Sequence, residues 1–162
     1  MRARTAVWMS SAVLCAVWCA TPLAAVEVAV LAGAHDPFKD GSTIEVGLEY
    51  RRPLAWRQLV WMAGAAGTGE GAGWLYSGLH RPFALGSGWE LRPGFALELY
   101  EEGSRGKDLG GVLEFRSSLE LSRRLRNGMA VGLSVYHVSN AGLYARNPGH
   151  NSIVLVVTHS LD

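Results

Sequence analysis

Residues 111–122 read GVLEFRSSLELS, and this stretch decides the fold class. Its odd-numbered positions from 113 to 121 hold Leu, Phe, Ser, Leu and Leu, whereas its even-numbered positions from 114 to 122 hold Glu, Arg, Ser, Glu and Ser. Successive side chains of a β-strand point to opposite faces of a sheet. The period of two therefore predicts a strand with one mainly apolar face and one polar face.

Seven further segments alternate in the same way. The pattern is clear in residues 43–51 and 89–100 and weaker in residues 26–34, 58–66, 73–80, 129–140 and 152–160. The connections between segments carry residues typical of turns, such as Asn127-Gly128 and Asn147-Pro148-Gly149. Eight such segments predict an all-β chain, folded as an eight-stranded antiparallel up-and-down β-barrel.

The composition of the two faces indicates which one points outward. The polar face combines Gly, Ala and Ser with Glu and Arg, which suits a narrow interior crossed by ion pairs. The apolar face carries Trp, Phe and Leu, which would crowd the lumen of an eight-stranded barrel. We therefore expect a transmembrane barrel whose apolar face meets lipid. Alternation alone also permits a soluble periplasmic lipid carrier with its apolar face lining a cavity.

Composition excludes other classes of protein. The chain has 162 residues, of which 49% are hydrophobic and 18% charged, so it is not a disordered polymer. Its 15 Lys and Arg nearly balance 14 Asp and Glu, and no basic run with interleaved aromatics occurs. A nucleic-acid partner is therefore not expected, because such binding needs a basic face.

The N-terminal residues have the layout of an export signal. Arg2 and Arg4 precede an uncharged apolar stretch over residues 6–20, and small residues lead to Ala25. This pattern predicts a cleaved signal peptide at residues 1–25 and a barrel domain at residues 26–162. A membrane-anchoring helix is the alternative, but the stretch is short for one. Cys15 and Cys19 both lie in this segment, so the exported chain would have no disulfide, thiol nucleophile or cysteine metal site.

Polar residues interrupt two apolar rows at one end of the predicted barrel. If both termini lie in the periplasm, residues 36–42, 67–73, 100–109 and 140–151 face outward, and residues 51–57, 81–88 and 123–128 face the periplasm. His137 and Ser139 continue the apolar row of Val131, Leu133 and Val135. On the next strand, Asn151 continues the row of Ile153, Leu155 and Val157. His150 is expected to be a loop residue.

A His and a Ser two positions apart on one strand face are neighbours, so His137 and Ser139 can form a base–nucleophile pair. A polar group facing hydrocarbon carries a desolvation cost unless it is paired. The simpler interpretation is that these are polar residues at the membrane boundary.

The longer string YHVSNAGLYARNPGHN, residues 136–151, resembles the PagL family of outer-membrane lipid A 3-O-deacylases. The pattern of that family reads His-x-Ser-Asn-Ala/Gly, then Asn-x-Gly, with a Glu fourteen residues after the His. The resemblance implies an eight-stranded barrel with a Ser–His–Glu triad on its lipid-facing wall. It implies that Ser139 attacks an ester carbonyl and that His137 accepts its proton, with Asn140 as the matching neighbour.

The resemblance also implies that the Gly142 amide and Asn147 stabilise the oxyanion. The chemistry requires no metal or cofactor, and its partners would be lipid A or lipopolysaccharide in the outer membrane. A homodimer is left open.

The third triad position departs from the family, because Asn151 stands where the family has Glu. An amide oxygen can orient the His ring but carries no charge. The first functional hypothesis is therefore a serine esterase that removes the 3-O-linked hydroxyacyl chain of lipid A. A catalytically reduced barrel that binds lipid or serves a structural role is the second. The soluble carrier is the third.

Overall fold

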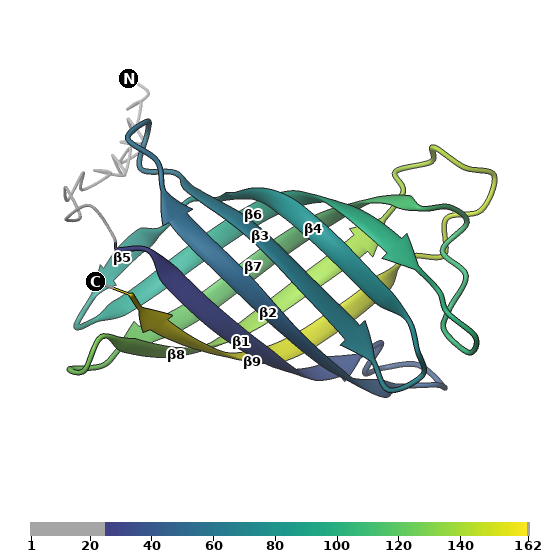
Figure 1. Ribbon diagram of the computed structural model, residues 1–162, viewed down its shortest axis with the longest axis horizontal. Coiled ribbons are helices and arrows are strands. Elements are labelled where there is room, and N and C mark those ends of the chain that lie inside the picture. Colours follow the sequence, from purple (N-terminus) through teal and green to yellow (C-terminus); the bar gives the residue numbers. More distant parts are fainter. Residues whose placement is uncertain (1–24, 162) are drawn as a thin grey trace, which may run out of the picture.

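A computed structural model describes residues 25–161, which form one closed antiparallel sheet (Figure 1). Its strands are β1 (Glu27–His35), β2 (Thr43–Pro53), β3 (Val60–Thr68), β4 (Gly73–His80), β5 (Phe83–Gly86), β6 (Trp89–Glu101), β7 (Leu113–Arg124), β8 (Met129–Ser139) and β9 (His150–Ser160). No helix among the described residues is long and apolar enough to cross a membrane. The predicted signal segment, residues 1–25, lies almost entirely outside the described residues.

The strand order is that of an up-and-down barrel. Neighbours in the sequence pair with each other, and β1 pairs with β9 to close the wall. β4 pairs directly with β6, so eight strands make the wall, as the alternation predicted. The prediction of residues 81–88 as a plain connection was wrong, because β5 forms there and pairs with the start of β6. Arg81 and Pro82 separate β5 from β4, so β5 continues that side of the hairpin beyond the closed wall.

The charged face of the strands fills the lumen. Arg51 donates hydrogen bonds to the two carboxylate oxygens of Glu120 at 3.2 and 2.7 Å, and Arg92 donates to Glu27 at 2.9 Å. All four side chains are buried. Charges buried in this way are stable only when they are paired and hydrogen-bonded. The Glu–Arg pairs expected for a narrow interior are therefore present.

The apolar face of the same strands points away from the lumen. Ile44 is 72% exposed, Leu48 59% and Phe95 53%. These bulky side chains lie outside the wall, whereas a soluble carrier would direct its apolar side chains into the cavity. This confirms the outward orientation of the apolar face, and such a band is what a lipid-facing surface requires.

The closing seam between β1 and β9 is tight. A Cβ at Gly33 would lie 2.1 Å from the carbonyl oxygen of Ile153, so only glycine permits this approach. The register pairs His35 with Ser152 at the last rung of the seam. This brings the turn after β1 against the beginning of β9.

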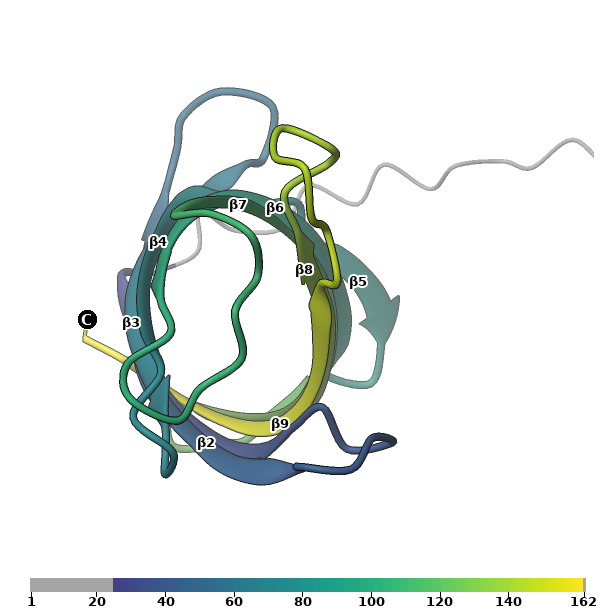
Figure 2. The ribbon, with the colours of Figure 1, turned by 90° about the vertical axis from the view of Figure 1, so that its right-hand side faces the viewer.

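One end of the barrel, here called the loop end, carries residues 36–42, 69–72, 102–112 and 140–149. Viewed from this end, the segment between β6 and β7 crosses the barrel opening (Figure 2). His150 does not lie in the loop, so that expectation was wrong. It is the first residue of β9, is fully buried, and has its ring 4.2 Å from that of His35.

Candidate active site on the outer wall

The predicted site residues His137, Ser139 and Asn151 lie near the loop end. His137 is on β8 and Asn151 on β9, and the register places them directly opposite each other. Both side chains are exposed on the outer face, whereas their strand neighbours Tyr136 and Ser152 are buried. The period of two thus carries the polar pair to the lipid-facing side, as predicted.

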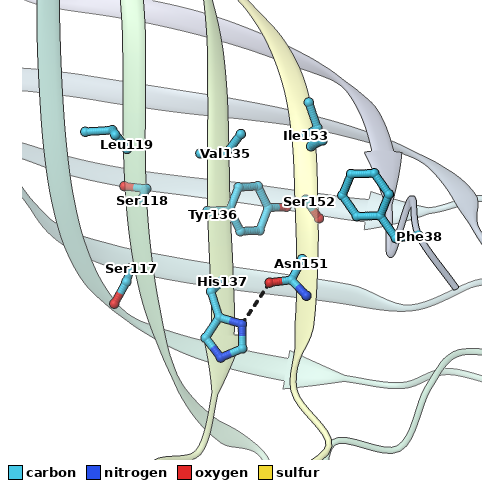
Figure 3. Close-up of a pocket in the computed structure, with 10 residues that line it drawn as sticks. All are labelled: Phe38, Ser117, Ser118, Leu119, Val135, Tyr136, His137, Asn151, Ser152 and Ile153. Atoms are coloured by element: carbon cyan, nitrogen blue, oxygen red, sulfur yellow. Dashed lines mark hydrogen bonds between the residues drawn. The ribbon is translucent and has the colours of Figure 1, made fainter.

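A hydrogen bond joins the pair across the strands. His137 Nδ1 lies 3.0 Å from Asn151 Oδ1 (Figure 3). An amide oxygen can only accept, so Nδ1 must carry the proton in this bond. In a neutral imidazole the second nitrogen, Nε2, is then unprotonated and available as a base. Asn151 therefore selects the tautomer that a nucleophile beside Nε2 requires.

Ser139 ends β8, two residues beyond His137. Gly149 lies against both residues: a Cβ built on it would be 3.2 Å from His137 Cε1 and 3.5 Å from Ser139 Cβ. Gly149 also has a positive φ of 53°, which favours glycine. Among residues 25–161, no hydrogen bond joins Ser139 Oγ to His137. Such contacts are often long in the absence of substrate and tighten in the reacting complex.

Asn140 holds the loop that follows the site. Its side chain is fully buried and donates from Nδ2 to the carbonyl oxygens of Leu109, at 2.9 Å, and Arg146, at 2.8 Å. Its Oδ1 accepts from the Gly142 amide at 3.0 Å. All its polar atoms are thus used in joining the loop at 140–149 to the segment that crosses the barrel opening. Asn140 therefore stabilises the backbone of the loop beside the site and has no side-chain donor free to bind a substrate.

The two residues expected to bind the oxyanion have different positions. The Gly142 amide already donates to Asn140, in a turn where Gly142 and Ala141 both have positive φ. Asn147 accepts the Asn140 amide through Oδ1 at 3.0 Å, a bond that does not involve its Nδ2 group. Asn147 can therefore offer a donor directly, whereas Gly142 would have to share its hydrogen bond.

A groove of about 590 Å³ runs along the outer wall beside the pair. It is lined by Phe38, Ser117, Ser118, Leu119, Val135, Tyr136, His137, Asn151, Ser152 and Ile153 (Figure 3). Leu119, Val135 and Ile153 give it an apolar floor, and His137 and Asn151 stand at one end. An extended apolar chain laid in this groove would end at the polar pair.

Two charged residues behind the site, Asp36 and Lys107, were not among the predicted site residues. Asp36 lies in residues 36–42, which were predicted only as an outward-facing connection, and nothing in the local pattern connects it with a residue on the last strand. Burial raises the pKa of the Asp36 carboxyl, but hydrogen bonds from Lys107 and the Asn151 amide outweigh this and leave the pKa below its usual value. Burial lowers the pKa of Lys107.

Comparison with solved structures supports the fold. The crystal structure of the outer membrane enzyme PagL has a TM-score of 0.66 and 24% sequence identity, over 83% of this chain and 99% of that one. Neisserial surface protein A has a TM-score of 0.63 and 10% identity, over 83% of this chain and 95% of that one. A designed transmembrane β-barrel has a TM-score of 0.62 and 11% identity, over 87% of this chain and 98% of that one.

Comparison of the sequence itself carries the assignment. A search of curated proteins gave no significant match. The family model described as lipid A 3-O-deacylase (PagL) matches residues 44–160, which contain both the wall of the barrel from β2 onward and the whole polar site. The chain therefore belongs to the PagL family of lipid A 3-O-deacylases.

Proposed function

We propose that this protein is an outer-membrane esterase that removes the 3-O-linked hydroxyacyl chain of lipid A. The observation that carries the proposal is the hydrogen bond between His137 Nδ1 and Asn151 Oδ1 on the outward face. It leaves Nε2 as the base, at the end of an apolar groove that suits an acyl chain. Lipid A fills the outer leaflet of the outer membrane, so an outward-facing site at the loop end meets its substrate without extracting it from the membrane.

The proposed reaction has two steps. Ser139 Oγ attacks the ester carbonyl while His137 Nε2 accepts the hydroxyl proton, and the tetrahedral intermediate forms. His137 returns that proton to the departing sugar oxygen, which leaves an acyl group on Ser139. Water then attacks the acyl-enzyme with the same base, and the hydroxy fatty acid is released.

The oxyanion of each intermediate would accept hydrogen bonds from Asn147 Nδ2 and the Gly142 amide. Because the Gly142 amide bonds to Asn140 in the free protein, it would share or exchange that bond as the negative charge develops. Removing an oxyanion donor typically costs about 10²–10³ in kcat. The bond between Asn147 and the Asn140 amide uses Oδ1 and not Nδ2, so we expect Asn147 to contribute more of the oxyanion stabilisation than the Gly142 amide.

The decisive experiment compares lipid A from cells that produce the protein with lipid A from cells that produce Ser139→Ala. Mass spectrometry should show loss of one hydroxyacyl mass with the unmodified protein and intact lipid A with the variant. Both barrels must be shown to fold in the outer membrane, by their heat-modifiable mobility on gels. Equal deacylation by the variant would mean that Ser139 is not the nucleophile.

The second candidate function is a lipid-binding barrel without catalysis. It is favoured by the uncharged Asn151 in place of an acid and by the Gly142 amide that is already bonded. Unchanged lipid A from cells with a folded unmodified protein would support it. Binding of lipopolysaccharide to that protein would then be measured directly.

Export to the outer membrane requires a signal, and we propose that residues 1–25 are the signal peptide and are removed by cleavage after Ala25. Intact-mass measurement of protein purified from the outer membrane should give a chain that begins at Val26. A mass that includes Met1 would contradict the cleavage.

A further inference from the structure

Asp36 lies beside Asn151 across the closing seam and forms hydrogen bonds with both the carbonyl oxygen and the amide of the Asn151 backbone. The Asp36 amide donates to the Asn151 carbonyl oxygen at 2.7 Å. In return, the Asn151 amide donates to Asp36 Oδ1 at 2.9 Å. The residue that contacts His137 is therefore fixed by a partner 115 residues away in the sequence. Asp36 is buried and has a φ of 46°, a conformation that Asp tolerates better than most residues.

Lys107 holds Asp36 in turn. Its ammonium donates to Asp36 Oδ2 at 2.7 Å and also to the carbonyl oxygen of Gly149. Gly149 is the residue whose Cα lies against His137 and Ser139. The Lys107 ammonium thus bonds both to the turn after β1, through Asp36, and to the loop before β9, through Gly149. Lys107 comes from the segment that crosses the barrel opening (Figure 2), where Tyr100 bonds its carbonyl oxygen at 2.9 Å.

An amide at the third position has a stricter geometric requirement than a carboxylate. A carboxylate presents two equivalent oxygens, so it can accept from an imidazole in either of two orientations. Asn presents one oxygen, and its other terminal atom is a donor that would oppose the Nδ1 proton. The alignment of Asn151 with His137 must therefore be held more tightly than that of a Glu. The Asp36 carboxylate is itself paired with Lys107, and Lys39 lies 3.6 Å away, so its negative charge is largely compensated.

We propose that Asp36, held by Lys107, is a positioning residue that aligns Asn151 with His137 for catalysis. The proposal rests on the esterase function proposed above. It assigns Asp36 a geometric role through the Asn151 backbone and no contact with the substrate.

The test uses the full-length barrel in detergent micelles, with lipopolysaccharide as substrate. Asp36→Ala removes the acceptor for the Asn151 amide and should lower kcat by about 10- to 100-fold, the range expected when catalytic groups are misplaced. Asp36→Asn keeps an oxygen acceptor for the Asn151 amide but turns a donor toward the Lys107 ammonium, so its kcat should lie between those of Asp36→Ala and the unmodified protein. Asp40→Ala, at an exposed position of the same turn, is the matched control and should behave as the unmodified protein.

A second measurement does not depend on catalysis. Amide hydrogen exchange at Asn151, followed by NMR, should be slow in the unmodified protein and in Asp36→Asn, and fast in Asp36→Ala. If the unmodified protein does not deacylate lipopolysaccharide, the esterase proposal fails, but the exchange rates still test the positioning contact.

Two results would overturn the positioning role. The first is a folded Asp36→Ala protein with unchanged kcat or unchanged protection of the Asn151 amide. The second is an Asp36→Asn protein as impaired as Asp36→Ala, because this would show that the acceptor for the Asn151 amide contributes nothing to the activity.

Discussion

Replacing Asn151 by Glu introduces the negative charge that the site lacks. The Asn151 oxygen already lies 3.0 Å from His137 Nδ1, and both side chains are exposed on the outer wall, so the Glu side chain, one methylene longer, has room to bend and bring a carboxylate oxygen to Nδ1. The imidazole becomes positively charged when it accepts the Ser139 proton. A carboxylate would stabilise that charge in the transition state, whereas the amide can only orient the ring.

The magnitude follows from the separation of the charges. Two unit charges about 4 Å apart interact by about 1 kcal/mol in water and about 4 kcal/mol at an effective dielectric constant of 20. His137 and Asn151 lie near the loop end of the lipid-facing wall, between water and hydrocarbon, so about 1.4 kcal/mol, which is about tenfold in rate, is a conservative value within this range. We expect Asn151→Glu to raise kcat by about tenfold. In serine proteases the opposite change, Asp to Asn, costs about 10⁴, which sets the upper limit.

The assay measures release of hydroxy fatty acid from lipopolysaccharide by the purified barrel. Asn151→Gln is the matched control, because Gln has the length of Glu but no charge. The gain of Asn151→Glu over Asn151→Gln should shrink in high salt, which screens exposed charges. A folded Asn151→Glu protein that is no faster than Asn151→Gln would refute the reasoning and show that this site works with an amide.

Three further perturbations test other parts of the structure. Gly149→Ala would place a Cβ 2.7 Å from a backbone carbonyl oxygen of β8 and 3.2 Å from the His137 ring. We therefore expect kcat to fall by about tenfold while the barrel still assembles. An unchanged kcat would show that the backbone at 149 can move away from His137 without cost. Arg51→Met would leave Glu120 buried and unpaired and should lower the free energy of unfolding in urea by about 3–5 kcal/mol, with exposed Arg52→Met as the control. The lowered pKa of Asp36 means that its contribution to stability is present above its unfolded value of about 3.9 and is lost as the pH falls through the lower folded value. The difference in melting temperature between the unmodified protein and Asp36→Ala should therefore be larger at about pH 5 than at acid pH and should shrink as the pH falls through the folded pKa of Asp36. A difference that does not change with pH would contradict the ion pair.

The alternation of side chains was sufficient to predict the barrel and its orientation. In residues 111–122 the polar positions Glu114, Arg116 and Glu120 are buried, and the apolar positions Leu119 and Leu121 are exposed, as the period of two predicts. Alternation is a local property, because each Cβ direction depends only on its own strand. The same rule placed His137 on the outer face.

The ends of strands were predicted less well. His150 was expected in a loop, yet it begins β9 and lies inside the barrel beside His35. Its environment depends on where the register of β8 and β9 ends, and the sequence Asn-Pro-Gly before it indicates a turn without saying where pairing resumes. The short strand β5 was missed for the same reason.

The sequence by itself was sufficient to predict the eight-stranded barrel and its outward apolar face, and it indicated His137, Ser139 and Asn151 as candidate site residues at one end of the barrel. Only the tertiary structure decided what aligns that group. Asp36 meets Asn151 because the first and last strands close the wall in one register, and Lys107 reaches both Asp36 and Gly149 because its segment crosses the opening. These contacts join residues far apart in the chain, so they depend on barrel closure and leave no periodic signal in the sequence.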